Sequence, residues 1–366
     1  MDIKAAIFKQ PKQPFEFEHV QLDELKEGEV LVKLVATGVC HTDISVWEAN
    51  FPFGYPGILG HEGAGIVEAV GPGVTKVKAG NHVLLHIAAC GKCEYCISGT
   101  PAYCKDMLPL NFSGRRPDGS CPYHLHGEDL NGLFFYQSSF ATYSIASERN
   151  VVAIPDDLPL PVMAPLGCGF ITGAGTVMNT LKAEPGTSIA IFGAGSVGLA
   201  AVMAAKIAGC TTIVTIDIND ERLALAKELG ATHTINGRNS NSSEEIQTRI
   251  IPGGVNFSID TTGDSSVIQH AVTALRILGT CALVAVRTVG AKQEFDYLNL
   301  ALGRTVKGVI AGDSIPEIFI PRLISFYRQG LFPIDRLISF YNFEDINNAI
   351  QDAGSGKTIK AVLLMQ

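Results

Sequence analysis

The sequence of 366 residues is 46% hydrophobic and 17% charged, which predicts a globular protein large enough for two or three domains. The formal net charge is −8, and no basic tract is longer than Arg115-Arg116, which argues against nucleic acid as a partner. No apolar run reaches the ~18 residues of a membrane span, and the first residues lack the apolar core of a signal peptide. We therefore expect a cytoplasmic protein with no membrane partner, whose nine cysteines are thiols or metal ligands rather than disulfides.

The N-terminal part favours β structure and leads into residue types that bind metal. Strands are predicted at residues 5–8, 15–20 and 29–36, before the sequences GVCHTD and GHEGAG. Cys40 and His61 are ordinary zinc ligands, but two ligands this far apart in the sequence do not define a site. His61 could equally be a core histidine in a glycine-rich strand.

A cluster of four cysteines follows in a turn-rich stretch. Cys90, Cys93, Cys96 and Cys104 have the spacing C-x2-C-x2-C-x7-C. Four thiolates at this spacing can close a tetrahedral zinc site with no open position, which is typical of a structural site. The first three cysteines also resemble an iron–sulfur run, but the fourth is too distant for the usual bacterial pattern and no proline follows it. Structural zinc is the interpretation that we favour.

The middle of the chain is predicted to be a long surface excursion that leads back to β structure. Residues 111–133 are polar and rich in turn-forming residues, and His124 and His126 within them are interpreted as solvated loop residues. β structure is expected again at 134–145. Prolines between residues 155 and 165 then mark a domain boundary, and a helix of small residues is expected after Cys168.

The clearest motif is a strand–turn–helix–strand pattern at residues 187–217. Apolar strands at 189–192 and 213–216 flank the turn GAGSVG and a small-residue helix. Gly193 permits the tight turn, Gly195 lets the backbone approach a pyrophosphate, and Gly198 lets the helix pack close to the strand. The helix N-terminus offers free N–H groups to that pyrophosphate, so the motif predicts a dinucleotide site.

Asp217 ends the second strand of that motif. A carboxylate at this position can accept hydrogen bonds from both ribose hydroxyls and repels a 2′-phosphate. The sequence therefore favours NAD over NADP as the cofactor.

Strands and helices continue to alternate after Asp217, which predicts a parallel, doubly wound sheet. The remaining elements are expected as strands at 232–235, 257–260, 281–286, 306–310 and 359–364, and helices at 220–229, 243–250, 267–278 and 343–352. The sequence GSGKT at 354–358 is interpreted as a helix–strand connection. A phosphate loop would need a glycine where Gln351 stands, and the opposite order of elements.

With these motifs in hand, the sequence resembles the zinc-dependent medium-chain alcohol dehydrogenases over essentially the whole chain. Residues 60–74 fit that family's signature G-H-E-x2-G-x5-G-x2-V, and the four cysteines and GAGSVG follow in the family's order. The stretches SSFATY, APLGCGF and IFIPRLISFYRQG are similar to the bacterial aryl-alcohol branch of the family.

The resemblance implies an α/β fold with a β-rich, GroES-like catalytic domain and a doubly wound parallel (Rossmann) domain that binds NAD. The implied boundaries are 1–170 for the catalytic domain with its structural zinc lobe at 90–104, 171–310 for the NAD-binding domain, and 311–366 for a return to the catalytic domain.

The resemblance also implies two Zn2+ ions per chain, one of them structural. Cys40, His61 and Cys168 would ligate the catalytic zinc, with water or the substrate oxygen in the fourth place and Glu62 as a transient ligand. The ion would act as a Lewis acid on the alcohol oxygen.

Two residues beside these ligands have implied roles in catalysis. Asp43 would orient His61 through a hydrogen bond, and Thr42 would accept the proton of the substrate hydroxyl. The family's usual relay histidine is replaced by Ser45, so the resemblance leaves the route of proton exit open.

The implied cofactor residues surround the glycine turn, with His41 and Lys360 as cations near the pyrophosphate and Thr172 beside the nicotinamide. The full set is His41, Thr172, Gly193, Gly195, Val197, Gly198, Asp217, Arg222 and Lys360. The glycine usual near the nicotinamide amide is Ala285 here.

The implied substrate pocket is flat and apolar, which suits an aromatic ring. Its residues are Phe51, His86, Phe134, Phe135, Val286 and Ile310. His86 stands where the family commonly has an apolar residue, and a structural histidine bonded to nearby backbone is the interpretation that we favour.

The implied activity is oxidation of an aromatic primary alcohol of the benzyl alcohol type by NAD, reversibly. An allylic or terpenoid primary alcohol dehydrogenase, acting on geraniol or perillyl alcohol, is an alternative that the sequence separates poorly. Glutathione-dependent formaldehyde dehydrogenase is a third alternative. Its substrate is an anionic glutathione conjugate, which requires cationic side chains in the pocket, and the only nearby candidates in the sequence are Arg115 and Arg116. An NAD-binding protein that uses zinc for structure alone and has no catalytic activity is a fourth alternative. Such a protein would lack ligands of the catalytic zinc, whereas Cys40, His61 and Cys168 are all present here.

A homo-oligomer, either a dimer or a tetramer, is also implied. In this family the nucleotide domains join edge to edge, which would involve the strand predicted at 281–286 and the segment that follows near residue 300.

Overall fold

The structure is a computed structural model that describes residues 1–365. It divides into two compact units. The first contains Met1–Cys168, Ile315–Arg322 and the chain from Ile334 onward, and the second contains Gly169–Ser314 and Leu323–Pro333. The sequence predicted that the chain would return once to the first unit, at residue 311. In the structure it enters the first unit at Ile315, goes back to the second at Leu323 and enters the first again at Ile334.

The first unit is rich in β structure and contains two sheets. The smaller sheet has the order β4-β1-β2-β7-β8. Strands β1 and β2 form an antiparallel pair. Most of β1 is buried, including residues 5–8, whereas the buried residues of β2 are Val20 and Leu22. The bounds are β1 Asp2–Phe8, β2 Glu16–Leu22, β4 Gly57–Ile58, β7 Tyr123–Leu125 and β8 Glu128–Asp129.

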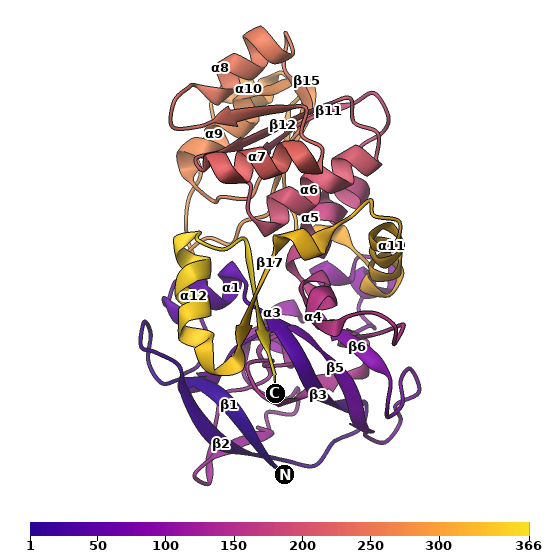
Figure 1. Ribbon diagram of the computed structural model, residues 1–366. Coiled ribbons are helices and arrows are strands. Elements are labelled where there is room, and N and C mark those ends of the chain that lie inside the picture. The colour runs from indigo at the N-terminus through magenta and orange to yellow at the C-terminus, as the bar shows by residue number, and fades with distance from the viewer. Residues whose placement is uncertain (366) are drawn as a thin grey trace. The chain divides into compact units, whose positions relative to one another are not determined.

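The larger sheet of the first unit has the order β10-β6-β5-β3-β18-β17, with β9 also paired to β3. The last strand of the chain, β18, lies antiparallel to β3, so the C-terminal segment completes the sheet that begins near the N-terminus (Figure 1). The bounds are β3 Glu29–Gly38, β5 Glu62–Val70, β6 His82–Leu85, β9 Tyr143–Ser147, β10 Val151–Ile154, β17 Ile338–Asn342 and β18 Lys360–Leu364.

The second unit is built on one parallel sheet with the order β13-β12-β11-β14-β15-β16. This confirms the predicted doubly wound sheet, whose order changes direction at β11, between β12 and β14. Helices α6, α7 and α9 pack on it (Figure 1). The bounds are β11 Ser188–Phe192, β12 Thr212–Asp217, β13 His233–Asn236, β14 Val255–Asp260, β15 Leu275–Leu283 and β16 Thr305–Gly308.

The helices range in length from four residues in α2 to thirteen in α11. Among residues 1–365 no single helix is long and apolar enough to cross a membrane, and one bent pair, Leu160–Gly167 with Gly169–Thr180, passes that test only when counted together. The bounds are α1 His41–Trp47, α2 Glu94–Ile97, α3 Met107–Phe112, α4 Leu160–Met163, α5 Gly169–Gly175, α6 Ser196–Ile207, α7 Asp220–Leu229, α8 Ser242–Glu245, α9 Ser265–Thr273, α10 Tyr297–Ala301, α11 Pro316–Arg328 and α12 Ile346–Ser355.

Two predicted elements were wrong. Residues 134–145 were expected as β structure, but Phe134–Tyr136 form a short 3-10 turn, and the strand β9 begins only at Tyr143. The helix expected at 267–278 ends at Thr273, because the chain from Leu275 pairs with β14 instead. The segment at 354–358 does connect the end of α12 with β18, as expected.

Candidate active site

The centre of the site is a buried histidine held by a carboxylate. Helix α1 begins after Cys40, and the backbone N–H of Cys40 donates to Oδ2 of Asp43 at 2.9 Å. The other oxygen of Asp43, Oδ1, lies 2.9 Å from Nδ1 of His61 and accepts from the backbone of Gly60 at 3.0 Å. Both side chains are fully buried. Asp43 therefore fixes the plane of the His61 ring and directs Nε2 away from itself.

The free nitrogen of His61 faces two thiols and a carboxylate. One ligand atom from each of Cys40, His61, Glu62 and Cys168 can be chosen so that all lie within 4.8 Å of one another. Nε2 of His61 is buried and has no hydrogen-bond partner within residues 1–365, which is costly unless something binds there. Two thiolates and an imidazole are the donors that Zn2+ prefers, so these residues fit a zinc ion with an open fourth position.

The protonation of this group is strongly perturbed. Burial lowers the pKa of His61, but Asp43 and Cys40 outweigh it and hold the pKa well above its usual range. The hydrogen bond from Cys168 holds the pKa of the Cys40 thiol well below its usual range, and the positive charges of His61 and Lys360 act in the same direction. The group thus already favours a thiolate at Cys40, which is the form that binds metal.

Glu62, at the start of β5, is bonded to Lys360, at the start of β18, and β3 lies between these two strands in the sheet. The Nζ atom of Lys360 lies 2.9 Å from both carboxylate oxygens of Glu62 and donates to the carbonyl of Val39 at 3.0 Å. Both side chains are buried, and a side chain at Gly38 would collide with the carboxylate. In the structure the ammonium of Lys360 is bonded to Glu62 and Val39, and its expected place near the pyrophosphate stays a prediction.

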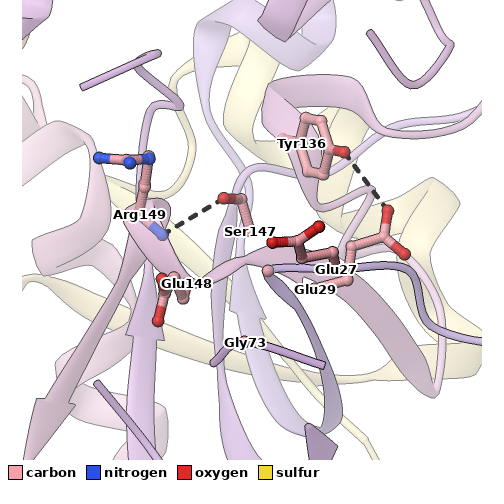
Figure 2. A pocket seen from close by; sticks show the side chains of 8 residues that line it. Glu27, Glu29, Gly73, Tyr136, Ser147, Glu148 and Arg149 are labelled. Carbon is pink, nitrogen blue, oxygen red and sulfur yellow. Dashed lines mark hydrogen bonds between the residues drawn. The ribbon is translucent and has the colours of Figure 1, made fainter. Parts of the chain in front are cut away.

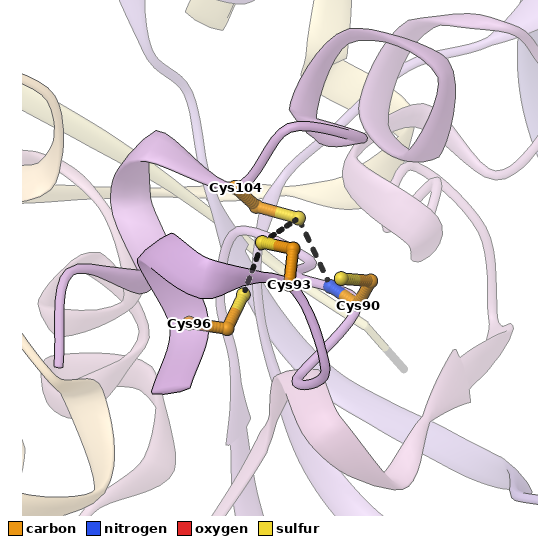
Figure 3. A group of neighbouring side chains, drawn as sticks. All are labelled: Cys90, Cys93, Cys96 and Cys104. Carbon is orange, nitrogen blue, oxygen red and sulfur yellow. Dashed lines mark hydrogen bonds between the residues drawn. The ribbon is translucent and has the colours of Figure 1, made fainter. Parts of the chain in front are cut away.

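The four cysteines of the lobe converge on one point (Figure 3). The Sγ of Cys93 lies 3.5 Å from that of Cys96 and 3.9 Å from that of Cys104. A tetrahedron with Zn–S distances of about 2.3 Å has edges of about 3.8 Å, so the four sulfurs fit a single ion with all positions filled. Hydrogen bonds from the backbone of Lys105 and Cys96 lower the pKa of Cys93 to about 6, which favours a thiolate.

Aromatic rings surround His61. The ring of Phe135 stacks on His61, with centroids 4.4 Å apart and planes at 20°, and Phe134 meets the same imidazole edge-on at 5.5 Å. Phe51 joins this group through Phe112, at 4.7 Å. Phe112 was absent from the predicted pocket, although it contacts both Phe134 and Phe135. No motif pointed to it, because it lies in the polar stretch that was interpreted as a surface excursion.

His86 is buried and bonded to its neighbouring backbone, as the structural interpretation required. Its Nδ1 lies 2.9 Å from the carbonyl of Ile87. Its Nε2 is buried without a hydrogen-bond partner among the described residues and lies 3.9 Å from a carboxylate oxygen of Glu317. The remaining predicted pocket residues, Val286 and Ile310, belong to the second unit.

The glycine turn of the second unit has the geometry that a dinucleotide motif needs. Gly193 has a φ of 97°, which only glycine adopts readily, and a side chain at Gly198 would collide with the carbonyl of Gly193. Gly195 precedes helix α6, which Ser196 and Val197 begin. The turn lies after β11, where the strand order of the sheet changes direction, the usual place for a ligand in such sheets.

Asp217 lies at the carboxyl end of β12 and faces this turn. Its carboxylate accepts the backbone N–H of Ala194 at 2.6 Å and that of Asn219 at 2.9 Å. Asn219 caps helix α7, which carries Arg222. Thr172 lies in α5, and His41 is the exposed first residue of α1. The structure thus brings the glycines and Asp217 together.

The two arginines that could have received an anionic substrate are committed elsewhere. Arg116 is buried and donates to the carboxylate of Glu29 through Nε at 2.7 Å and Nη2 at 2.8 Å. Arg115 forms an ion pair with Asp129. Neither provides a free cation for a glutathione conjugate.

Comparisons with known proteins agree with this geometry. A family model described as alcohol dehydrogenase GroES-like domain matches residues 26–156, and one described as zinc-binding dehydrogenase matches residues 196–327. The chain is 41% identical over 363 residues to geraniol dehydrogenase from Castellaniella defragrans, covering 99% of this chain and 97% of that protein.

Two solved structures are similar over the full length. Benzyl alcohol dehydrogenase from Acinetobacter calcoaceticus is 43% identical with a TM-score of 0.96, and all of both chains is covered. An alcohol dehydrogenase zinc-binding domain protein from Burkholderia ambifaria is 46% identical with a TM-score of 0.97, covering 100% of this chain and 99% of that one.

Proposed function

The chain belongs to the zinc-dependent medium-chain alcohol dehydrogenase family, and from this premise we propose that it oxidises aromatic primary alcohols to aldehydes, reversibly, with NAD. The observation that carries the choice of substrate is the group of phenylalanine rings beside His61. Rings of this kind pack well against another aromatic ring in offset or edge-to-face geometry.

The residues of the site have distinct tasks in this proposal. Cys40, His61 and Cys168 hold a catalytic zinc, and the four cysteines of the lobe hold a second, structural one. When bound, zinc supplies Lewis-acid polarisation of the alcohol and NAD supplies the hydride acceptor. Asp43 holds Nδ1 of His61, which sets the direction of Nε2.

The hydroxyl of Thr42 is the group that receives the alcohol proton. Thr42 is buried, and its Oγ1 lies 3.8 Å from Sγ of Cys40. Ser45 follows one turn later in α1 in place of a relay histidine. We therefore expect the proton to leave Thr42 by a route that does not use residue 45 as a base.

The alternative is an allylic primary alcohol, because a relative 41% identical to this chain is a geraniol dehydrogenase. Both kinds of substrate place an sp2 carbon beside the carbinol. The glutathione-dependent reaction has less support, since Arg115 and Arg116 are engaged in ion pairs.

Steady-state rates with benzyl alcohol, geraniol and ethanol test the proposal. We expect kcat/KM for benzyl alcohol to exceed those for geraniol and ethanol. Phe51→Ala is expected to lower kcat/KM for benzyl alcohol by about tenfold and that for ethanol much less, because it removes ring contacts without touching His61. The control, Phe17→Ala, removes a ring that packs on Phe343 in the same unit. A higher kcat/KM for geraniol than for benzyl alcohol would favour the allylic alternative. Equal losses of kcat/KM for benzyl alcohol and ethanol in Phe51→Ala would show that Phe51 does not belong to the substrate pocket.

The preference for NAD over NADP rests on Asp217. Its carboxylate lies at the glycine turn, where it can accept ribose hydroxyls and repels a 2′-phosphate. We expect Asp217→Gly combined with Ile218→Arg to shift the ratio of kcat/KM values toward NADP by at least about tenfold. Asp220→Asn, at a nearby carboxylate in α7, is expected to leave the ratio unchanged. Equal use of both cofactors by the natural protein would contradict this role of Asp217.

We also propose that the chain forms a homo-oligomer. Residues around β15 and α10 expose a run of large apolar side chains, including Leu278, Tyr297 and Leu298. Patches of this kind are typical of surfaces that bind another protein.

A further inference from the structure

The segment Leu133–Ser138, here called the aromatic turn, has an unusual backbone. Four of its residues that are not glycine have left-handed φ values: Leu133 (53°), Phe135 (53°), Tyr136 (51°) and Ser138 (48°). This conformation is unfavourable for residues with side chains and persists only where the surroundings fix it, commonly at functional sites.

Buried polar side chains fix the aromatic turn. Ser138 accepts the N–H of Phe134 at 2.9 Å and donates its hydroxyl to the carbonyl of Ile58 at 2.6 Å. Nδ2 of Asn150 lies 3.3 Å from the carbonyls of both Phe135 and Tyr136. Because both Ser138 and Asn150 are fully buried, these bonds are not exchanged for water.

Tyr136 anchors the opposite side of the turn. Its hydroxyl donates to Oε1 of Glu29 at 3.3 Å, at the edge of a pocket of about 320 Å³ that Glu27, Glu148 and Arg149 also line (Figure 2). Glu29 is in turn paired with the buried Arg116. The turn is thus tied on one side to an ion pair, which leaves its other side to face His61.

The side that faces His61 contributes two contacts. Phe135 stacks on the imidazole, and the amide of Gln137 bonds to the backbone on either side of Glu62. Nε2 of Gln137 donates to the carbonyl of His61 at 3.0 Å, and its Oε1 accepts the N–H of Gly63 at 3.1 Å. Gln137 is completely buried.

These two bonds take the place of a missing strand partner. On one side, β5 pairs with β3, where Glu62 lies opposite Gly38 and Gly63 opposite Thr37. On its other side, among the described residues, β6 pairs with β5 from Ala64 to Ile66. The backbone of residues 61–63 would be unpaired there, and the amide of Gln137 supplies one donor and one acceptor in the pattern of a strand.

We infer that Gln137 is a positioning residue for the metal ligand His61. By fixing the carbonyl of His61 and the N–H of Gly63, its amide sets the Cα–Cβ direction from which the imidazole reaches the two thiols, while Phe135 limits rotation of the ring. The inference rests on the proposed zinc chemistry, but it concerns retention of the ion, so its main readout is the rate of zinc release, and turnover serves to assign the two phases.

The test is the rate at which zinc leaves the folded protein to an excess of a chromogenic chelator. The natural protein is expected to release two ions per chain in two phases, and the catalytic phase is the one that coincides with loss of benzyl alcohol oxidation. Gln137→Met has nearly the same size but no amide, and we expect it to accelerate the catalytic phase about 10–100-fold, as for other partners of metal ligands. The phase from the four cysteines is expected to keep its rate.

Two further variants make the result specific. Gln247→Met is the matched control, since Gln247 also donates its amide to a backbone carbonyl, that of Thr273, at 2.6 Å, but in the second unit. It is expected to keep both release rates. Gln137→Glu keeps the acceptor for the N–H of Gly63 and loses the donor to the carbonyl of His61, so we expect it to accelerate the catalytic phase less than Gln137→Met does. If Gln137→Met does not fold, the rate of zinc release from Gln137→Glu tests the positioning role instead.

The outcomes separate the inference from the proposed function. Release of both ions at natural rates from a folded variant of Gln137, or equal acceleration of both phases, would overturn the positioning role. A selective acceleration together with a lower kcat and an unchanged KM for NAD supports it. A natural protein that binds no zinc at Cys40, His61 and Cys168 would instead overturn the proposed function.

Discussion

At the scale of single residues, His86 is a buried imidazole kept neutral by its surroundings. Burial lowers its pKa to about 4, and Lys76 acts in the same direction, while Glu317 and the carbonyl of Ile87 oppose the shift. The unfolded chain gives a histidine a pKa of about 6.5. Between these two values the unfolded state binds a proton that the folded state does not.

This difference predicts a loss of stability in mild acid. As the pH falls from about 6.5 to about 4, the free energy of unfolding is expected to drop by about 3 kcal/mol on account of His86. His86→Asn keeps a donor for the carbonyl of Ile87 but does not titrate, so its stability is expected to fall less over this range. Urea unfolding at several pH values measures the difference. The exposed His19, changed to Asn, is the control, and parallel curves for His86→Asn and the natural protein would contradict the prediction.

The predicted groupings of residues that the structure brings together depend on local geometry or on a motif. The glycines of the turn and the four cysteines have short, fixed spacings, and Asp217 ends the strand that follows the turn, so these groupings could be predicted from the order of residues. The structure brings Cys40, His61 and Cys168 together as well, although only the family resemblance pointed to that set.

The contacts of Lys360 and Gln137 could not be predicted from the sequence. Lys360 binds Glu62, which is 298 residues away, only because β18 lies beside β3. Gln137 binds the backbone of His61 and Gly63, which no side-chain pattern encodes. Both roles depend on strand pairing between distant segments, so neither could be predicted from residue types or spacing.

At the scale of elements, the strand–turn–helix–strand motif at 187–217 was predicted correctly because its signals are local. The glycine turn, the small residues of α6 and the apolar strands β11 and β12 all favour the same structure. Helix α7 begins after the predicted cap, Asn219, whose side chain accepts the N–H groups of Glu221 and Arg222.

The failure at residues 134–145 has the opposite cause. Aromatic residues favour strands, and the sequence there is rich in them. In the structure, bonds from Ser138, Ser144 and Asn150 to the backbone hold the segment in a tight turn. Tertiary contacts thus override the local preference, and the result is the strained aromatic turn beside His61.

At the scale of the whole molecule, the second unit has a surface that suits contact with another copy. Strand β16 is at the edge of its sheet and pairs only with β15 among the described strands. Large apolar side chains near this edge are exposed, with Leu278 at 73%, Tyr297 at 85% and Leu298 at 66%. An unpaired edge with exposed apolar residues is a hazard unless a partner covers it.

We therefore predict that the protein is a homo-oligomer joined through this surface. Sedimentation at micromolar concentration is expected to show a dimer or a tetramer for the natural protein. Leu278→Lys combined with Leu298→Glu places charges where apolar contact is expected, so this variant is expected to sediment as a smaller species while keeping its fold. Ile97→Lys is the control, since Ile97 is 76% exposed but lies in the cysteine lobe of the first unit. A stable monomer of the natural protein, or dissociation by the control variant alone, would show that these exposed side chains do not join the subunits.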